Sequence, residues 1–327
     1  MLFRSGRKPV IVSGLCLLIC GSVVAAFAET LAELALGRLL QGSGAIASAT
    51  MALAADYTRV EQRTKASAII GASIGISFAL ALVLGPVLAA WGGLSGVFEV
   101  TAIMGALGLA VVLLWLPATP QLTDGGRAHL ADRQRLGEAL WGPGLGILYG
   151  SIFCLHLLLM AAFTAIPSIM SEQVGLPAAQ HAWMYLATLI IALPGVALLI
   201  RRRGDQQHPR PIIAITIVLA VGGLFLALEA DAVVMLGVGL ILFFVGFTAL
   251  ETLLPALVSI FAPVSLRGTA MGIFSSAQFF GVFSGGILGG AALQWGGVGA
   301  LVAFLSGLTV LWLAGVWRYA RTPVVAF

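Results

Sequence analysis

A succession of long apolar segments, separated by short stretches that hold nearly all the charge, constrains this chain more than any other feature. Each segment is long enough to cross the hydrocarbon core of a membrane as a helix, which takes roughly 20 residues. Charged residues make up 9% of the 327 residues and hydrophobic ones 60%, whereas about a quarter of an average soluble domain is charged. The pattern therefore predicts an all-α integral membrane protein. Ten spans are expected, near residues 9–28, 31–55, 66–90, 94–116, 143–169, 182–200, 211–228, 232–260, 268–293 and 297–317.

The basic residues predict how these spans are oriented. Apart from Arg38, all of the 17 Lys and Arg residues fall in the termini or in every second loop, and the loops between carry acids such as Glu29, Glu172 and Asp231. Because Lys and Arg are retained on the cytoplasmic side of a membrane, both termini are expected to be cytoplasmic. The net charge of +4 is explained by this topology, so no nucleic-acid partner is expected.

An internal repeat relates the two ends of the chain. A shift of 204 residues places Trp91-Gly92-Gly93 on Trp295-Gly296-Gly297 and Arg63 on Arg267. A shift of 202 residues pairs three further glycines, Gly21 with Gly223, Gly37 with Gly239 and Gly44 with Gly246. Spans one to four therefore correspond to spans seven to ten, and membrane transporters are often built from such repeats. Since two complete repeats would have six spans each, two helices are expected to be absent at the N-terminus.

The repeat and the charged stretch in its middle divide the chain into three parts. We expect an incomplete N-terminal bundle of four spans over residues 1–116 and a C-terminal six-helix bundle over residues 143–327. A cytoplasmic linker over residues 117–142 joins the two bundles in this interpretation.

Three motifs resemble those of a known transporter family. The segment from Arg4 to Pro9 is similar to the end of its cytoplasmic loop motif, Arg38-Leu-Leu-Gln41-Gly42 to its fourth-helix motif, and the glycines from Gly71 to Gly85-Pro86 to its fifth-helix antiporter motif. The chain thus resembles the major facilitator superfamily, and within it the drug/proton antiporters of the bacterial YajR type. The resemblance implies a major facilitator fold in the bacterial inner membrane, with ten transmembrane helices equivalent to helices 3–12 of a twelve-helix transporter.

The resemblance also implies a function. It implies a secondary active transporter that exports drugs or small hydrophobic metabolites by alternating access, coupled to protons. The expected partners are a small-molecule substrate, protons and the lipid bilayer. Two alternatives stay open, namely an exporter of sugars or other small polar solutes and a non-functional truncated remnant or scaffold of such a transporter. The sequence contains no nucleophile motif, metal-ligand cluster or phosphate loop, so neither enzymatic activity nor a cofactor is expected.

Ionisable and polar side chains within the spans are candidates for substrate or proton binding, because a charged side chain in a membrane costs roughly 2.5–3.5 kcal/mol. The candidates are Arg38, Gln41, His156, Glu251 and Gln278. Arg38 can pair with a substrate or with a protonatable acid, Glu251 can bind and release a proton, and His156 can act as a proton carrier near neutral pH. Each of these side chains could instead form a structural hydrogen bond between helices.

Two further sets of residues concern gating and packing. The resemblance implies cytoplasmic ion pairs of Arg4, Arg7 and Lys8 with Asp56 that latch the outward-facing state, whereas the simpler interpretation is ordinary topological charge. Small residues at every fourth position let two helices approach closely. Helix packing, or a hinge, is therefore expected at Gly71, Gly75, Gly85, Pro86, Gly285 and Gly289.

Overall fold

The computed structural model describes residues 7–44, 46, 49–50, 53, 57–58, 62–116, 133–201, 210–263 and 266–319. All regular elements in this part of the chain are helices. They belong to two compact units, Met1–Asp132 and Arg133–Phe327, each with its own packed helices.

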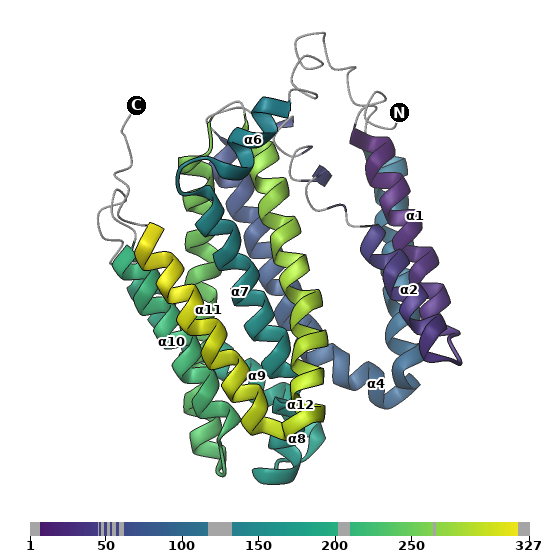
Figure 1. The fold of residues 1–327 in the computed structure, drawn as a ribbon. Coiled ribbons are helices and arrows are strands. Elements are labelled where there is room, and N and C mark those ends of the chain that lie inside the picture. Colours follow the sequence, from purple (N-terminus) through teal and green to yellow (C-terminus); the bar gives the residue numbers. More distant parts are fainter. Residues whose placement is uncertain are drawn as a thin grey trace. The chain divides into compact units, whose positions relative to one another are not determined.

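The first unit contains α1 (Arg7–Ala26), α2 (Leu31–Ser43) and α4 (Arg63–Trp115). α1 packs against both α2 and α4 (Figure 1). α2 begins with a capping box, in which the Glu33 amide donates to the Thr30 hydroxyl at 3.2 Å and the Thr30 amide donates to the Glu33 carboxylate at 3.1 Å. Since amides in the first turn of a helix have no intrahelical acceptor, Glu33 has a structural role at this helix start.

The second unit contains the helices from α6 to α12. These are α6 (Arg133–Trp141), α7 (Leu145–Phe163), α8 (Ile166–Ser168), the π-helical η3 (Ile169–Gln173), α9 (Ala178–Arg201), α10 (Arg210–Leu228), α11 (Val233–Phe261) and α12 (Arg267–Tyr319). α7 packs along α12, α10 along α11, and α9 against α11 (Figure 1). α6 lies in the stretch predicted as a linker, yet Ala139 is fully buried and its carbonyl accepts a hydrogen bond from Tyr149 at 2.8 Å. The second unit therefore includes α6.

Glycines bring the backbones of two equivalent helix pairs into contact. Between α1 and α2, a Cβ on Gly21 would lie 2.6 Å from the carbonyl oxygen of Gly37, and one on Gly37 would lie 2.8 Å from that of Gly21. Between α10 and α11, Gly223 and Gly239 have the same mutual contacts, again at 2.6 and 2.8 Å. Residues without a side chain permit this close approach. The register of 202 residues thus relates two helix pairs with the same packing.

Two long helices bend at equivalent glycines. The backbone of α4 is non-helical at Gly93 (φ 63°, ψ −158°), and that of α12 at Gly296 and at Gly297 (φ 64°, ψ −156°). A positive φ combined with a ψ near 180° is essentially closed to residues that carry a Cβ. The two bends lie in the register of 204 residues and coincide with the span boundaries predicted there.

The predicted count of ten spans is not confirmed. Among the described residues, seven helical segments are long and apolar enough to cross a membrane. One of these segments, Thr269–Arg318, has 50 residues although it contains the bend at Gly297. Within the predicted span 31–55, α2 covers Leu31–Ser43, and most residues from 45 to 55 lie outside the described part, so this span is not tested. The all-helical membrane character of the chain agrees with the prediction.

We expect Gly297→Ala to lower the melting temperature of the detergent-solubilised protein. Holding a residue with a Cβ in this backbone conformation costs roughly 1–3 kcal/mol. Gly307→Ala is the matched control, because Gly307 is helical and a Cβ there would meet nothing within 4 Å. Differential scanning fluorimetry on both variants measures the effect, and equal melting temperatures would contradict it.

Candidate functional site

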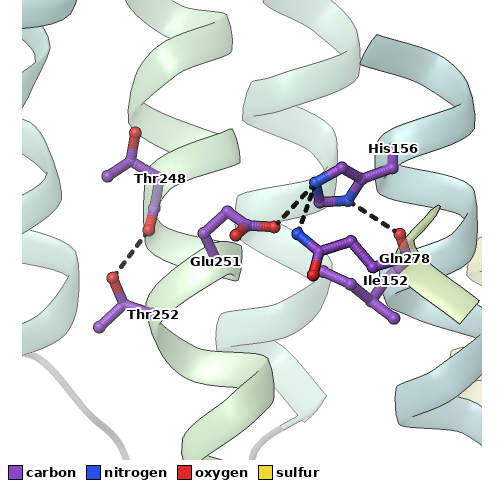
Figure 2. A network of polar contacts seen from close by, with 6 residues as sticks. All are labelled: Ile152, His156, Thr248, Glu251, Thr252 and Gln278. Atoms are coloured by element: carbon purple, nitrogen blue, oxygen red, sulfur yellow. Dashed lines mark hydrogen bonds and ion pairs between the residues drawn. The ribbon is translucent and has the colours of Figure 1, made fainter. Parts of the chain in front are cut away.

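Three polar side chains from three helices of the second unit meet around one imidazole ring. His156 lies on α7, Glu251 on α11 and Gln278 on α12 (Figure 2). The Nε2 atom of His156 lies 2.9 Å from Nε2 of Gln278 and 3.4 Å from Oε1 of Glu251. The other ring nitrogen, Nδ1, lies 3.2 Å from the carbonyl oxygen of Ile152 on the preceding turn of α7. The side chain of His156 is 8% exposed and that of Glu251 is 31% exposed, so the ring is buried and the carboxyl group is partly buried.

Close packing of α7 on α12 positions two members of this cluster. A Cβ on Gly285 would lie 2.9 Å from the Cα atom of Leu157, and one on Gly289 would lie 2.8 Å from the Cβ atom of Ala161. Glycines spaced by four residues in α12 therefore meet residues spaced by four in α7. His156 directly precedes Leu157, and this close approach lets the Gln278 amide reach its ring.

The third member is supplied by α11 at a point where the helix loses a backbone hydrogen bond. Pro255 lies inside α11, four residues after Glu251, and proline has no amide hydrogen to donate to the Glu251 carbonyl. The nearby Thr252 hydroxyl donates to the Thr248 carbonyl at 2.9 Å (Figure 2), so it is not directed at the cluster. Oε1 of Glu251 is buried and has no hydrogen-bond partner. Its 3.4 Å contact with His156 is therefore an ion-pair distance without hydrogen-bond geometry.

The partners of His156 determine the tautomer of its ring. A backbone carbonyl can only accept, so the Ile152 oxygen requires a hydrogen on Nδ1. Nε2 of the neutral ring is then an acceptor, and the Gln278 amide can donate to it. Oε1 of Glu251 faces the same nitrogen, and this contact is attractive when a proton lies between the two atoms. The imidazole nitrogen and the carboxyl oxygen are thus two groups able to bind a proton, 3.4 Å apart.

Arg38 and Gln41 form a second polar cluster, within the first unit. Arg38 donates from Nη1 to Oε1 of Gln41 at 2.8 Å, and Gln41 donates from Nε2 to the hydroxyl of Ser22 at 2.7 Å. Ser22 in turn donates to the carbonyl of Leu18 at 2.7 Å. The Arg38 guanidinium also lies 5.9 Å from the centre of the Phe98 ring. Arg38 is exposed, so its other donors are accessible to a further partner.

Sequence reasoning missed several residues that complete these clusters. Ile152 contributes its backbone carbonyl, and the type of a residue does not reveal a role of its backbone. Its position four residues before His156, one helical turn away, could have indicated this contact. The Phe247 ring lies 5.6 Å from that of His156. Phe247, Phe98 and Ser22 belong to residue types that are common in spans, so the sequence carried no signal for them.

The candidate gating residues are only partly described. Arg4 and Asp56 lie outside the described residues, and Arg7 is described only as the first residue of α1. The Lys8 ammonium donates to the carbonyl of Leu116 at the end of α4, where carbonyls lack intrahelical donors. The cytoplasmic ion pairs with Asp56 stay a prediction.

The candidate packing residues have different surroundings. Gly285 and Gly289 contact the α7 backbone, whereas a Cβ on Gly85 would meet nothing within 4 Å. Gly71, Gly75 and Pro86 lie in α4, but their contacts fall outside the described part of the structure. Within that part, no group of three or more His, Cys, Asp or Glu residues could hold a metal ion.

Apolar helices of membrane-spanning length with polar side chains buried between them are typical of membrane transporters. The family model described as Major Facilitator Superfamily matches residues 2–284 of this chain. The chain therefore belongs to the major facilitator superfamily, as the sequence motifs indicated. It is a multi-pass membrane transporter and not an enzyme.

Known proteins resemble the chain in sequence and in fold. The inner membrane transport protein YajR of Escherichia coli (strain K12) is 39% identical over 334 aligned positions, which cover 99% of this chain and 71% of YajR. The tetracycline resistance protein, class B, of Escherichia coli is 33% identical over 128 positions, covering 37% of this chain and 30% of that protein. The crystal structure of the human organic anion transporter MFSD10 (TETRAN) has a TM-score of 0.68 at 21% identity, covering 95% of this chain and 77% of MFSD10. The last similarity concerns the fold alone.

Proposed function

We propose that this chain exports drugs or small hydrophobic metabolites across a bacterial inner membrane in exchange for protons. The observation that carries the proposal is the contact of Glu251 and Gln278 with the buried ring of His156 in a chain of a transporter family. Similarity to a tetracycline resistance protein supports efflux, and similarity to an inner membrane transport protein supports the location. Basic residues in alternate loops support cytoplasmic termini.

Proton coupling is supported by the composition of the cluster. A separate charge inside a membrane protein is costly, and a histidine facing a carboxyl group avoids that cost when the pair holds one proton. Oε1 of Glu251 is buried without a hydrogen-bond partner, so a proton or a polar substrate group that reached it would be bound favourably. Loading and unloading of this site on opposite sides of the membrane would couple proton entry to export.

An apolar substrate is supported by aromatic side chains close to the cluster in sequence. Phe280 follows Gln278 by two residues in α12, and its ring stacks on Phe153 of α7 at 5.6 Å and on Phe283 at 6.4 Å. The Phe280 and Phe283 side chains are 60% and 62% exposed. Exposed ring faces suit planar or apolar solutes. In the first unit, Arg38 and Gln41 are proposed as polar contacts for the substrate or for a protonatable acid.

The purified 327-residue chain in liposomes tests the proposal. We expect tetracycline or ethidium, added to liposomes that enclose a pH-sensitive dye, to change the internal pH at a rate well above that of protein-free liposomes. Sugars, added in the same way, should produce no change. A response to sugars alone would favour the exporter of polar solutes, and no response to any solute would favour a non-transporting scaffold; either result would overturn the proposal.

A further inference from the structure

Building on the proposed proton coupling, we infer that Gln278 is a positioning residue whose side-chain amide decides whether the shared proton rests on Glu251 or on His156. Gln278 lies 122 residues from His156 in sequence, and its Nε2 lies 2.9 Å from the ring nitrogen. It carries no charge and exchanges no proton itself. It acts through the histidine.

Competition for a single lone pair is the basis of this role. Nδ1 of His156 is engaged with the Ile152 carbonyl at 3.2 Å, which leaves one lone pair, on Nε2, in the neutral ring. Two groups face that lone pair, the Gln278 amide at 2.9 Å and the Glu251 oxygen at 3.4 Å. The amide has the shorter contact, and the Glu251 oxygen has no hydrogen-bond partner. In the observed arrangement the amide therefore occupies the lone pair, and Glu251 keeps the proton.

Rotation of the Gln278 amide by a half turn produces the second arrangement. Its carbonyl oxygen then replaces its NH2 group beside the ring, and an oxygen cannot donate to Nε2. The proton can now move, since the O–H bond of the Glu251 carboxyl breaks, its electron pair stays on the oxygen, and a new N–H bond forms on His156. The resulting imidazolium faces two acceptors, the Glu251 carboxylate and the Gln278 oxygen. The same side chain thus stabilises each protonation state with a different atom.

The surroundings of the ring allow this two-state behaviour. Among the described residues, Glu251 on α11 is the ionisable side chain within ion-pair distance of His156. The group that α12 contributes, the Gln278 amide, is uncharged. On α7 itself, the Tyr149 hydroxyl is bonded to a backbone carbonyl of α6 and Cys154 is a free thiol. Glu138 of α6 is exposed. The proton is therefore shared by one histidine and one carboxyl group.

Gln278→Leu tests the inference through the pH profile of transport. Leucine has a similar size but cannot donate to Nε2, so the neutral ring loses its hydrogen-bond donor there, whereas the imidazolium keeps the Glu251 carboxylate as an acceptor. The histidine therefore becomes the better proton acceptor. We expect the midpoint of the pH dependence of transport in liposomes to move to higher pH by about one unit, the equivalent of one hydrogen bond. Gln173→Leu, which removes an exposed glutamine of η3, should leave the midpoint unchanged. An unchanged midpoint in Gln278→Leu would overturn the inference.

A spectroscopic measurement separates this inference from the proposed function. In a chain with His129, His181 and His208 replaced, 15N NMR in detergent reports on His156 alone. We expect a hydrogen on Nδ1 and a bare Nε2 at high pH, and we expect the doubly protonated ring to persist to higher pH in Gln278→Leu and in the isosteric Gln278→Glu. If liposomes that contain the wild-type protein show no proton movement, the proposed function fails. The NMR titration of His156 still tests the role of Gln278 in that case. Identical His156 titrations in the wild type and in the folded variants would refute the inference.

Discussion

Glu251→Gln is expected to reduce the rate of proton-coupled transport by about 100-fold or more, the range for loss of a group that transfers protons. Glutamine has nearly the same shape as glutamate but cannot release a proton. Like a protonated carboxyl group, the side-chain amide is uncharged and can both donate and accept hydrogen bonds, so the variant should remain folded. The initial rate of substrate-driven pH change inside liposomes measures the effect.

A matched variant shows whether the loss is specific to the cluster. Glu229→Gln removes an exposed acid that follows α10, so it should transport at the wild-type rate. Equilibrium binding of the substrate to detergent-solubilised Glu251→Gln should persist, because the expected defect is in proton exchange. Proton-coupled transport at the wild-type rate in Glu251→Gln would mean that another group carries the proton.

Gly285→Leu is expected to cause the largest loss of stability, because it separates α7 from α12. A Cβ at this position would lie 2.9 Å from the Cα atom of Leu157, and a backbone atom cannot rotate away as a side chain can. Overpacking of this kind costs roughly 1–3 kcal/mol, which corresponds to a fall in melting temperature of about 2–12 °C for a unit of this size. Thermal unfolding in detergent, followed by tryptophan fluorescence, measures the effect.

The neighbouring glycine provides the control. A Cβ on Gly286 would meet nothing within 4 Å, and a leucine side chain is well suited to an apolar environment. Gly286→Leu should therefore melt close to the wild-type temperature and elute as a single species from a size-exclusion column. Equal stability of the two variants would show that the contact between α7 and α12 does not depend on Gly285.

Much of the architecture could be predicted because it follows from local properties of the chain. In a bilayer, backbone amides and carbonyls must be satisfied internally, so a long apolar segment is helical whatever its neighbours are. The bends at Gly93 and Gly297 could be located for a similar reason, since a positive φ at each requires glycine and the repeat carried the same Trp-Gly-Gly motif. Counting the spans was less secure, because the count depends on where each helix ends as well as on hydropathy.

The sequence by itself determined which polar residues lie within apolar helices, and the tertiary structure decided which of them meet. His156, Glu251 and Gln278 were candidates because each interrupts a long apolar run, yet no spacing relates them. The reason is physical: a helix that is apolar on every side carries no stripe to indicate which face packs inward. The rotation of α7 against α12 depends instead on the close fit of Gly285 and Gly289 against the α7 backbone. That fit brings residues 122 positions apart within 2.9 Å, because contacts between helices depend on shapes that only the folded chain possesses.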